Sequence, residues 1–207
     1  MSISVDKLGV AILAGGKSSR MGTDKGLIKL KGVPLVERII RQISHIFPKI
    51  FIVTNKIEQY SKFGYPMVSD LLPDIGPLGG LYTALDYDKH DYTLLLSCDM
   101  PFVSQGMLLY LMGAVDAYDV VVPRLSKQNH PEPLRAIYSK RCFSIIEKYI
   151  EEGGRRVVGF YSGINVRYVE RNEIEGVDPG ARSFFNANKP ADLIEASRLT
   201  KYYPLMN

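Results

Sequence analysis

The stretch LGVAILAGGKSSRMGTDKG, residues 8–26, decides the fold class of this chain. Its apolar start, residues 8–13, is broken by Gly15 and Gly16, which is typical of a buried strand that leads into a glycine-rich loop. Glycines let a backbone approach a ligand closely, and successive free N–H groups make a concave anion site. Three cations lie in the loop: Lys17, Arg20 and Lys25. The stretch predicts a phosphate site at the carboxyl end of a first strand.

Two familiar phosphate loops do not fit this stretch. Gly16-Lys17-Ser18 has the end of a Walker A motif, but the position five residues before Gly16 is Ala11, inside the strand, where the motif needs glycine. The dinucleotide fingerprint G-x-G-x-x-G is missing as well, because no three glycines have that spacing here. An ordinary strand-to-helix turn with exposed cations is the competing interpretation, and the loop alone does not identify a reaction.

Outward from the loop, short apolar runs alternate with segments of helical spacing, which indicates an α/β layered fold. Residues 92–97 are the most apolar strand candidate, and Leu94–Leu96 within them are apolar on both faces, as a central parallel strand requires. Residues 134–138 are predicted to form an antiparallel strand. The other strands are predicted at residues 49–54, 66–69, 120–122 and 165–169. Helices are predicted at residues 34–47, 56–62, 78–87, 104–116, 139–152 and 190–199.

The composition is that of an ordinary globular domain. The 207 residues are 46 % hydrophobic and 23 % charged, which excludes collagen-like, disordered and disulfide-scaffold classes. We find no repeat or linker and expect one domain over residues 1–207. Cys98 and Cys142 fit no metal motif, so both are expected as reduced thiols. The apolar run at residues 8–14 is too short for a signal core or a membrane span, so we expect a cytoplasmic protein.

The net charge is small and concentrated. The chain has 26 Lys+Arg and 22 Asp+Glu, so 26 − 22 = +4, too little for a polybasic nucleic-acid binder. Residues 13–26 hold three cations against Asp24, a net of +2, and residues 123–135 hold Arg124, Lys127 and Arg135 against Glu132, again +2. Two local basic patches therefore account for the excess, as expected for anionic small-molecule substrates.

The loop L-A-G-G-x-S-x-R-M-G-x-D-K resembles the motif of the molybdenum cofactor guanylyltransferases, nucleotidyltransferases with a Rossmann-like sheet. Related families typically have L-A-A-G, whereas this chain has Gly15-Gly16. The resemblance extends over the whole chain, through G-P-L-G-G at 76–80, C-D-M-P at 98–101 and F-N-A-N-K-P at 185–190, where Lys189 replaces the usual Thr. It implies a three-layer, mostly parallel nucleotidyltransferase fold with one or two antiparallel strands. The nucleotide would bind about residues 1–100 and the acceptor about residues 101–207.

The resemblance implies transfer of GMP from GTP to the terminal phosphate of molybdopterin, with release of pyrophosphate. Asp99 would hold Mg²⁺, although an Asp before Pro101 can equally cap a helix. Lys25, with Arg20 beside it, would stabilise the charge of the triphosphate. Both substrates are small molecules, and we expect no nucleic acid or membrane, with transient contacts to cofactor-biosynthesis proteins or acceptor molybdoenzymes.

Family positions also imply two sets of binding residues. The nucleotide would contact Leu13, Ala14, Gly15, Gly16, Lys25, Asn55, Asp70, Gly79, Gly80 and Asp99. The acceptor would contact His130, Arg135, Arg155, Arg156, Asn186 and Asn188. For Asn55 and Asp70 the structural alternative is turn formation, which both residue types favour, and adjacent arginines are usually solvent-facing.

Four other functions stay open at this point. The same loop and carboxylate would serve a cytidylyltransferase for the same pterin or a nucleotidyltransferase for a sugar phosphate. A non-catalytic nucleotide-binding module on the same fold is disfavoured by the presence of both Lys25 and Asp99. A nicotinamide-dependent oxidoreductase is disfavoured by the missing dinucleotide fingerprint.

Overall fold

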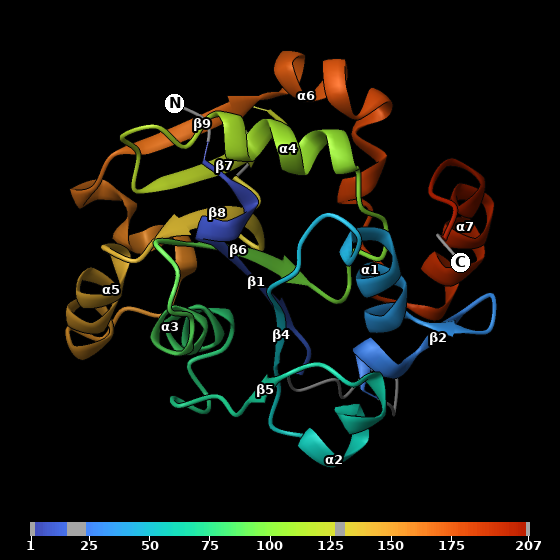
Figure 1. Ribbon diagram of the computed structural model, residues 1–207, viewed down its shortest axis with the longest axis horizontal. Helices are drawn as coiled ribbons and strands as arrows, with labels where there is room; N and C mark the ends of the chain where they lie inside the picture. The colour runs from blue at the N-terminus through green and yellow to red at the C-terminus, as the bar shows by residue number, and fades with distance from the viewer. Residues whose placement is uncertain (1–2, 16–23, 127–130, 206–207) are drawn as a thin grey trace.

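The computed structural model describes residues 3–15, 24–126 and 131–205. Strands in these ranges form a seven-stranded sheet (Figure 1) in the order β5-β4-β1-β6-β8-β7-β9. Their bounds, in that order, are Met67–Val68, Ile50–Val53, Leu8–Leu13, Tyr92–Ser97, Arg135–Ser139, Val120–Arg124 and Val166–Glu170. β8 runs antiparallel to β6 and β7, and the other pairings are parallel. The predicted mostly parallel sheet and the antiparallel strand at residues 134–138 are confirmed.

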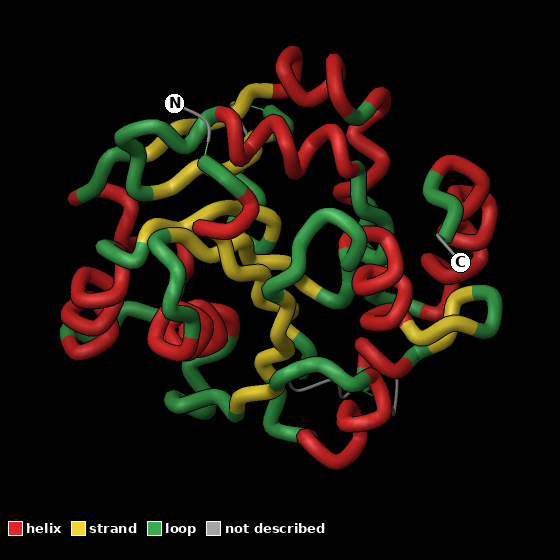
Figure 2. The backbone as a smooth tube through the Cα atoms, viewed as in Figure 1, coloured by secondary structure: helices red, strands yellow, loops and turns green. Residues whose placement is uncertain are grey.

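Helices cover both faces of the sheet (Figures 1 and 2), which confirms the three-layer α/β architecture. Along β1, Val10 and Ile12 pack on one face and Ala11 on the other, because neighbouring residues of a strand point to opposite faces. The first face is covered by α1 (Leu35–Ile43), α4 (Gln105–Gly113) and α6 (Arg171–Val177). The second is covered by α3 (Pro77–Tyr87) and α5 (Cys142–Glu151).

The pairing of β1 with β6 forms the centre of the molecule. The register runs from Leu8 beside Tyr92 to Leu13 beside Ser97. Leu94, Leu95 and Leu96 of β6 are all 0 % exposed, as predicted for a central strand. Burial of each such side chain contributes about 1.5–3 kcal/mol, so the two strands fix where their carboxyl ends lie.

The remaining elements connect or flank the sheet. The helices are α2 (Ile57–Tyr60) and α7 (Pro190–Leu199), with short 3₁₀ segments η1 (Val5–Lys7), η2 (Lys25–Leu27), η3 (Ser61–Phe63), η4 (Val157–Gly163), η5 (Pro179–Phe184) and η6 (Thr200–Tyr202). A small third cluster joins α1 to the C-terminal region through Leu35, Phe102 and Ala196. The C-terminal segment therefore packs against the loop after β6.

One β-hairpin and one helix were not predicted, and the helix predicted at residues 139–152 starts later than predicted. A β-hairpin joins β2 (Lys29–Leu30) to β3 (Val33–Pro34), and its turn has positive φ at both Lys31 and Gly32, as a two-residue hairpin turn requires. Strands of two residues are too short to show a period of two. α6 has one buried residue, Ile174, so its sequence lacks an apolar face. α5 begins at Cys142, because Ser139 still belongs to β8.

Lys189, where the chain departs from the family motif, directly precedes the helix predicted at residues 190–199. Lys189 is the N-cap residue of α7, and lysine has no side-chain oxygen to accept a hydrogen bond. Asp192 supplies the cap instead: its Oδ2 accepts hydrogen bonds from the backbone N–H groups of Asn188 and Lys189, both at 2.7 Å. The backbone at Asn188 is thereby fixed without the usual threonine.

Cys98 and Cys142 are both buried free thiols, as expected. Burial raises the pKa of each thiol, which keeps both in the neutral, unreactive form. Among the helices of the described residues, none combines the length and the apolar composition that crossing a bilayer demands.

A methyl group at Gly9 would disrupt the central strand. An ideal Cβ there would lie 1.9 Å from Oδ2 of Asp88, a carboxylate that is 4 % exposed and accepts a hydrogen bond from Thr93 Oγ1 at 2.8 Å. Gly9→Ala is expected to lower the free energy of unfolding by about 2 kcal/mol or more, as overpacked cores do. The control is Gly113→Ala, where a Cβ meets nothing within 4 Å. Equal urea midpoints for the two variants would contradict this packing.

Candidate active site

The carboxyl ends of β1 and β6 lie side by side and carry the predicted nucleotide loop and Asp99. The Leu13 carbonyl accepts a hydrogen bond from the Cys98 N–H at 3.1 Å, which extends the strand pairing past Ser97. Ala14 is 1 % exposed, and its N–H donates to the Val53 carbonyl at 2.9 Å. Gly16, Lys17 and Arg20 lie outside the described residues. The described part of the loop therefore lies at the carboxyl edge of the sheet, where α/β proteins usually bind their ligands.

Three of the predicted site residues meet at this edge. The Lys25 Nζ donates a hydrogen bond to Asn188 Oδ1 at 2.6 Å and lies 3.6 Å from Asp99 Oδ2. Asp99 is further oriented by the Ser97 hydroxyl, which donates to Asp99 Oδ1 at 2.6 Å. The Ala187 N–H donates to the Asp99 carbonyl at 2.8 Å. Lys25 and Asn188, which are 163 residues apart in the sequence, are thus in direct contact.

Asp99 stands on a loop that is held by a buried arginine. Arg135, the first residue of β8, is 0 % exposed and donates to the carbonyls of Met100 at 3.0 Å and Phe102 at 2.9 Å. Its guanidinium also lies over the Phe184 ring, 5.6 Å from the centroid. Burial lowers the pKa of Arg135 to about 10. The Arg135 side chain has no exposed surface with which to contact the acceptor, so that expectation is corrected. Its hydrogen bonds instead hold the loop that carries Asp99.

Asn55 and Asp70 shape the loop between β5 and α3. Asn55 Oδ1 accepts a hydrogen bond from the Asp70 N–H at 2.8 Å. Asp70 Oδ1 in turn accepts from the Leu72 N–H and from the Thr83 hydroxyl, both at 3.1 Å. Both residues therefore have the turn-forming contacts that the sequence allowed, just past the carboxyl ends of β4 and β5. Thr83, which completes this network, belongs to no motif that would have identified it.

Gly79 and Gly80 bring α3 close to the loops around it. A Cβ on Gly79 would lie 2.7 Å from the Leu72 carbonyl oxygen, and one on Gly80 would lie 3.1 Å from a methyl carbon of Leu13. Gly76, which precedes the helix, has φ 72° and ψ −146°, a conformation open to glycine. The glycines allow the helix start to pack directly on Leu13 and on the Asp70 loop.

The remaining predicted acceptor residues are dispersed. Asn186 is exposed, and its amide donates to the Phe184 carbonyl at 3.4 Å. Arg155 and Arg156 are exposed near the end of α5, where Arg155 donates to the carbonyls of Ile150 at 3.3 Å and Gly154 at 2.7 Å. His130 lies outside the described residues. Of the described acceptor candidates, Asn188 is joined to Lys25 by a hydrogen bond.

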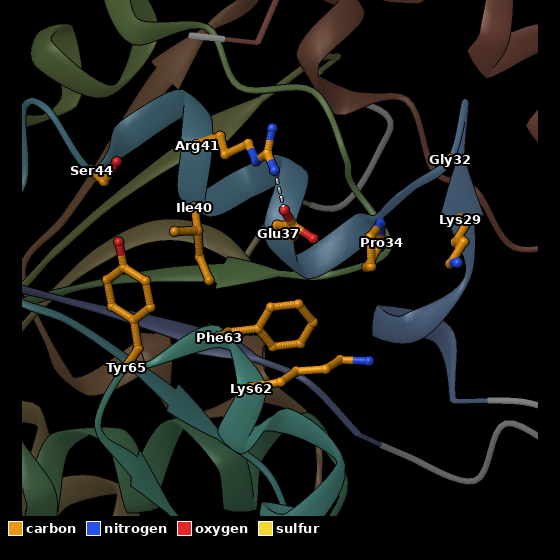
Figure 3. A pocket seen from close by; sticks show the side chains of 10 residues that line it. All are labelled: Lys29, Gly32, Pro34, Glu37, Ile40, Arg41, Ser44, Lys62, Phe63 and Tyr65. Atoms are coloured by element: carbon orange, nitrogen blue, oxygen red, sulfur yellow. Dashed lines mark hydrogen bonds and ion pairs between the residues drawn. The ribbon is translucent and has the colours of Figure 1, made fainter. Parts of the chain in front are cut away.

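One pocket of about 530 Å³ lies away from this cluster, between α1 and η3 (Figure 3). Figure 3 shows Phe63 and Lys62 extending from η3 into the space under α1. On the helix side, Arg41 and Glu37 form an ion pair at 2.5 Å. The pocket contains none of the residues predicted to bind substrate, so the site is defined by the Lys25–Asp99–Asn188 cluster and not by this hollow.

Comparison with known proteins finds similar sequences over most of the chain. Residues 10–165 match the model of a family described as "MobA-like NTP transferase domain". A probable molybdenum cofactor guanylyltransferase of Pelotomaculum thermopropionicum is 34 % identical over 185 residues, 89 % of this chain and 89 % of that protein. Another, of Natranaerobius thermophilus, is 34 % identical over 93 % of this chain and 96 % of its own length.

A solved structure is similar as well. The crystal structure of molybdopterin-guanine dinucleotide biosynthesis protein A from Archaeoglobus fulgidus superposes with a TM-score of 0.80. It is 28 % identical to this chain, and the match covers 94 % of this chain and 99 % of that one. The similarity in structure therefore extends over nearly the whole of both chains.

Substitution of Arg135 separates loop support from substrate contact. Arg135→Ala leaves the Met100 and Phe102 carbonyls without their donor. Its free energy of unfolding, measured in urea, should therefore be at least about 2 kcal/mol below that of the wild type. Arg155→Ala, the exposed control, should change stability by less than about 0.5 kcal/mol. An Arg135→Ala protein of unchanged stability with a raised KM for the acceptor would restore the direct-contact interpretation.

Proposed function

Because the chain belongs to the family of MobA-like NTP transferases, we propose that it transfers GMP from GTP to the terminal phosphate of molybdopterin and releases pyrophosphate. The observation that carries the proposal is the meeting of Lys25, Asp99 and Asn188 at the carboxyl edge of the sheet. A cation and two oxygen-bearing side chains at that edge suit a nucleoside triphosphate. The guanylyltransferase names of the relatives supply the choice of base and acceptor.

The reaction needs alignment and charge neutralisation more than proton transfer. The acceptor phosphate is already an anionic nucleophile, and phosphoryl-type transfer is catalysed mainly by positioning and electrostatics. The Lys25 side chain is 31 % exposed, so its ammonium can exchange the Asn188 oxygen for a phosphate oxygen. In that position it stabilises the negative charge that develops as pyrophosphate leaves. Arg20, on the same loop, is proposed as a second cation for this task.

The oxygen atoms around Lys25 also suit Mg²⁺. Asp99 offers a carboxylate that is 20 % exposed, and Asn188 offers an amide oxygen to the same ammonium. The described residues hold no group of three or more His, Cys, Asp or Glu side chains that could hold a metal. Mg²⁺ prefers oxygen ligands and is usually bound by one or two carboxylates together with substrate phosphates, so this donor set fits. When bound, Mg²⁺ would neutralise phosphate charge and hold the phosphates in line.

The other predicted residues complete the proposal. Leu13, Ala14, Gly15 and Gly16 would contact the nucleoside through their backbone, and the loop fixed by Asn55 and Asp70 would border the base with Gly79 and Gly80. On the acceptor side we propose Asn186, Arg155, Arg156 and His130. Both substrates are anionic small molecules of biosynthesis, and we propose a cytoplasmic enzyme that passes its product to acceptor proteins through transient contacts.

A panel of nucleotides tests the proposed function. The purified chain, Mg²⁺ and molybdopterin are incubated with GTP, CTP or UTP, and released pyrophosphate and the dinucleotide product are measured. GTP should give turnover at least about tenfold above CTP and UTP, since a site that hydrogen-bonds one base rejects others strongly. Turnover with CTP alone would replace the proposal with a cytidylyltransferase, and binding without turnover would indicate a non-catalytic module.

A matched pair of variants tests the carboxylate. Asp99→Asn keeps the size of the side chain but removes its charge, so the transfer rate should fall on the order of 10²-fold or more. Asp91→Asn makes the same change in an exposed residue just before the start of the same strand, β6, and should keep the wild-type rate. Equal rates for the two variants in a GTP transfer assay would remove Asp99 from the site.

A further inference from the structure

Directly before Lys25, a buried carboxylate receives three hydrogen-bond or ion-pair partners. Asp24 is 4 % exposed. Its Oδ1 accepts from the Tyr60 hydroxyl at 2.5 Å and from the Gly26 N–H at 3.2 Å, and its Oδ2 lies 3.1 Å from the Lys56 Nζ. A buried carboxylate is stable only with such partners. The backbone immediately before Lys25 is therefore held at a fixed place.

Two of the three partners of Asp24, Lys56 and Tyr60, belong to the segment around α2, which follows the strand next to β1. Lys56 directly precedes α2, and Tyr60 is the last residue of that helix, which follows β4. Asp24 caps η2 in the loop after β1. Tyr60 is 0 % exposed, and its ring lies 5.9 Å from that of Phe63. Burial and the bond to Asp24 both raise the pKa of Tyr60, which keeps the phenol protonated as a donor.

Gly26 gives an independent indication of the same contact. A Cβ at Gly26 would lie 2.4 Å from the Tyr60 hydroxyl oxygen, so a side chain at this position would block the bond to Asp24. Gly26 is buried, and its N–H is one of the donors to the same carboxylate. The residues on both sides of Lys25 thus face Tyr60, while the Lys25 ammonium extends to Asn188 and Asp99.

We propose that Tyr60 and Asp24 are positioning residues for Lys25: the buried phenol–carboxylate bond fixes η2 so that the Lys25 ammonium reaches the reacting phosphates. The proposal rests on the proposed function for its catalytic consequence. It adds a contribution from α2, an element that carries none of the predicted site residues. No substrate contact by Tyr60 or Asp24 is required.

A double-mutant cycle between Tyr60 and Lys25 tests the proposal. Tyr60→Phe removes the hydroxyl and keeps the ring, so the single-turnover rate with radiolabelled GTP should fall by about tenfold, the effect of one hydrogen bond to a charged group. In a Lys25→Met background, the same substitution should change the rate by less than about twofold, because the group that it positions is gone. Tyr65→Phe, a half-buried tyrosine five residues along the chain, is the control and should keep the wild-type rate.

Equal losses in both backgrounds would overturn the proposal, because Tyr60 would then act through general stability. Gly26→Ala provides the second variant: it should lower the rate in the wild type and have a smaller effect once Tyr60→Phe has removed the blocked hydroxyl. Equilibrium binding of GTP is measured on the same four chains of the cycle. A wild-type chain without guanylyl transfer would contradict the proposed function, and the binding cycle would still decide the coupling of Tyr60 to Lys25.

Discussion

The parallel pairing of β1 with β6 is the constraint on which the site depends. The two strands are buried on both faces between two layers of helices, and apolar side chains on each face fix their register. That register sets the Leu13 carbonyl against the Cys98 N–H and so places the start of the nucleotide loop beside Asp99. The geometry of the proposed site is thus a consequence of a strand pairing that contains none of the proposed catalytic residues.

Around this centre, three charged side chains hold the backbone segments that carry the partly exposed site residues. Arg135 supports the loop that carries Asp99, Asp192 fixes the backbone at Asn188, and Asp24 fixes the backbone before Lys25. Each uses a charged group to hold backbone atoms. Such preorganisation is what a reaction of two anionic substrates needs, because donors already aimed at the phosphates need little reorganisation in the transition state.

Most of the fold could be predicted because its strands are short apolar runs, as in residues 92–97, and its helices carry apolar residues at helical spacing, as in residues 35–43. The β2–β3 hairpin and α6 could not, since two-residue strands and a helix with one buried side chain leave no period to detect. For the site, Lys25, Asp99 and Asn188 followed from family motifs. Arg135 was assigned to the acceptor because a sequence does not reveal that an arginine is buried. Nothing in the sequence around Tyr60 indicates that its hydroxyl bonds to a carboxylate 36 positions away.

The most direct test of the central claim is a crystal structure of the chain with Mg²⁺ and a non-hydrolysable GTP analogue. The account predicts that the phosphates bind at the carboxyl ends of β1 and β6, that the Lys25 ammonium leaves Asn188 for a phosphate oxygen, and that Asp99 faces the metal. Phosphates bound elsewhere, with the hydrogen bond from Lys25 to Asn188 intact, would contradict it.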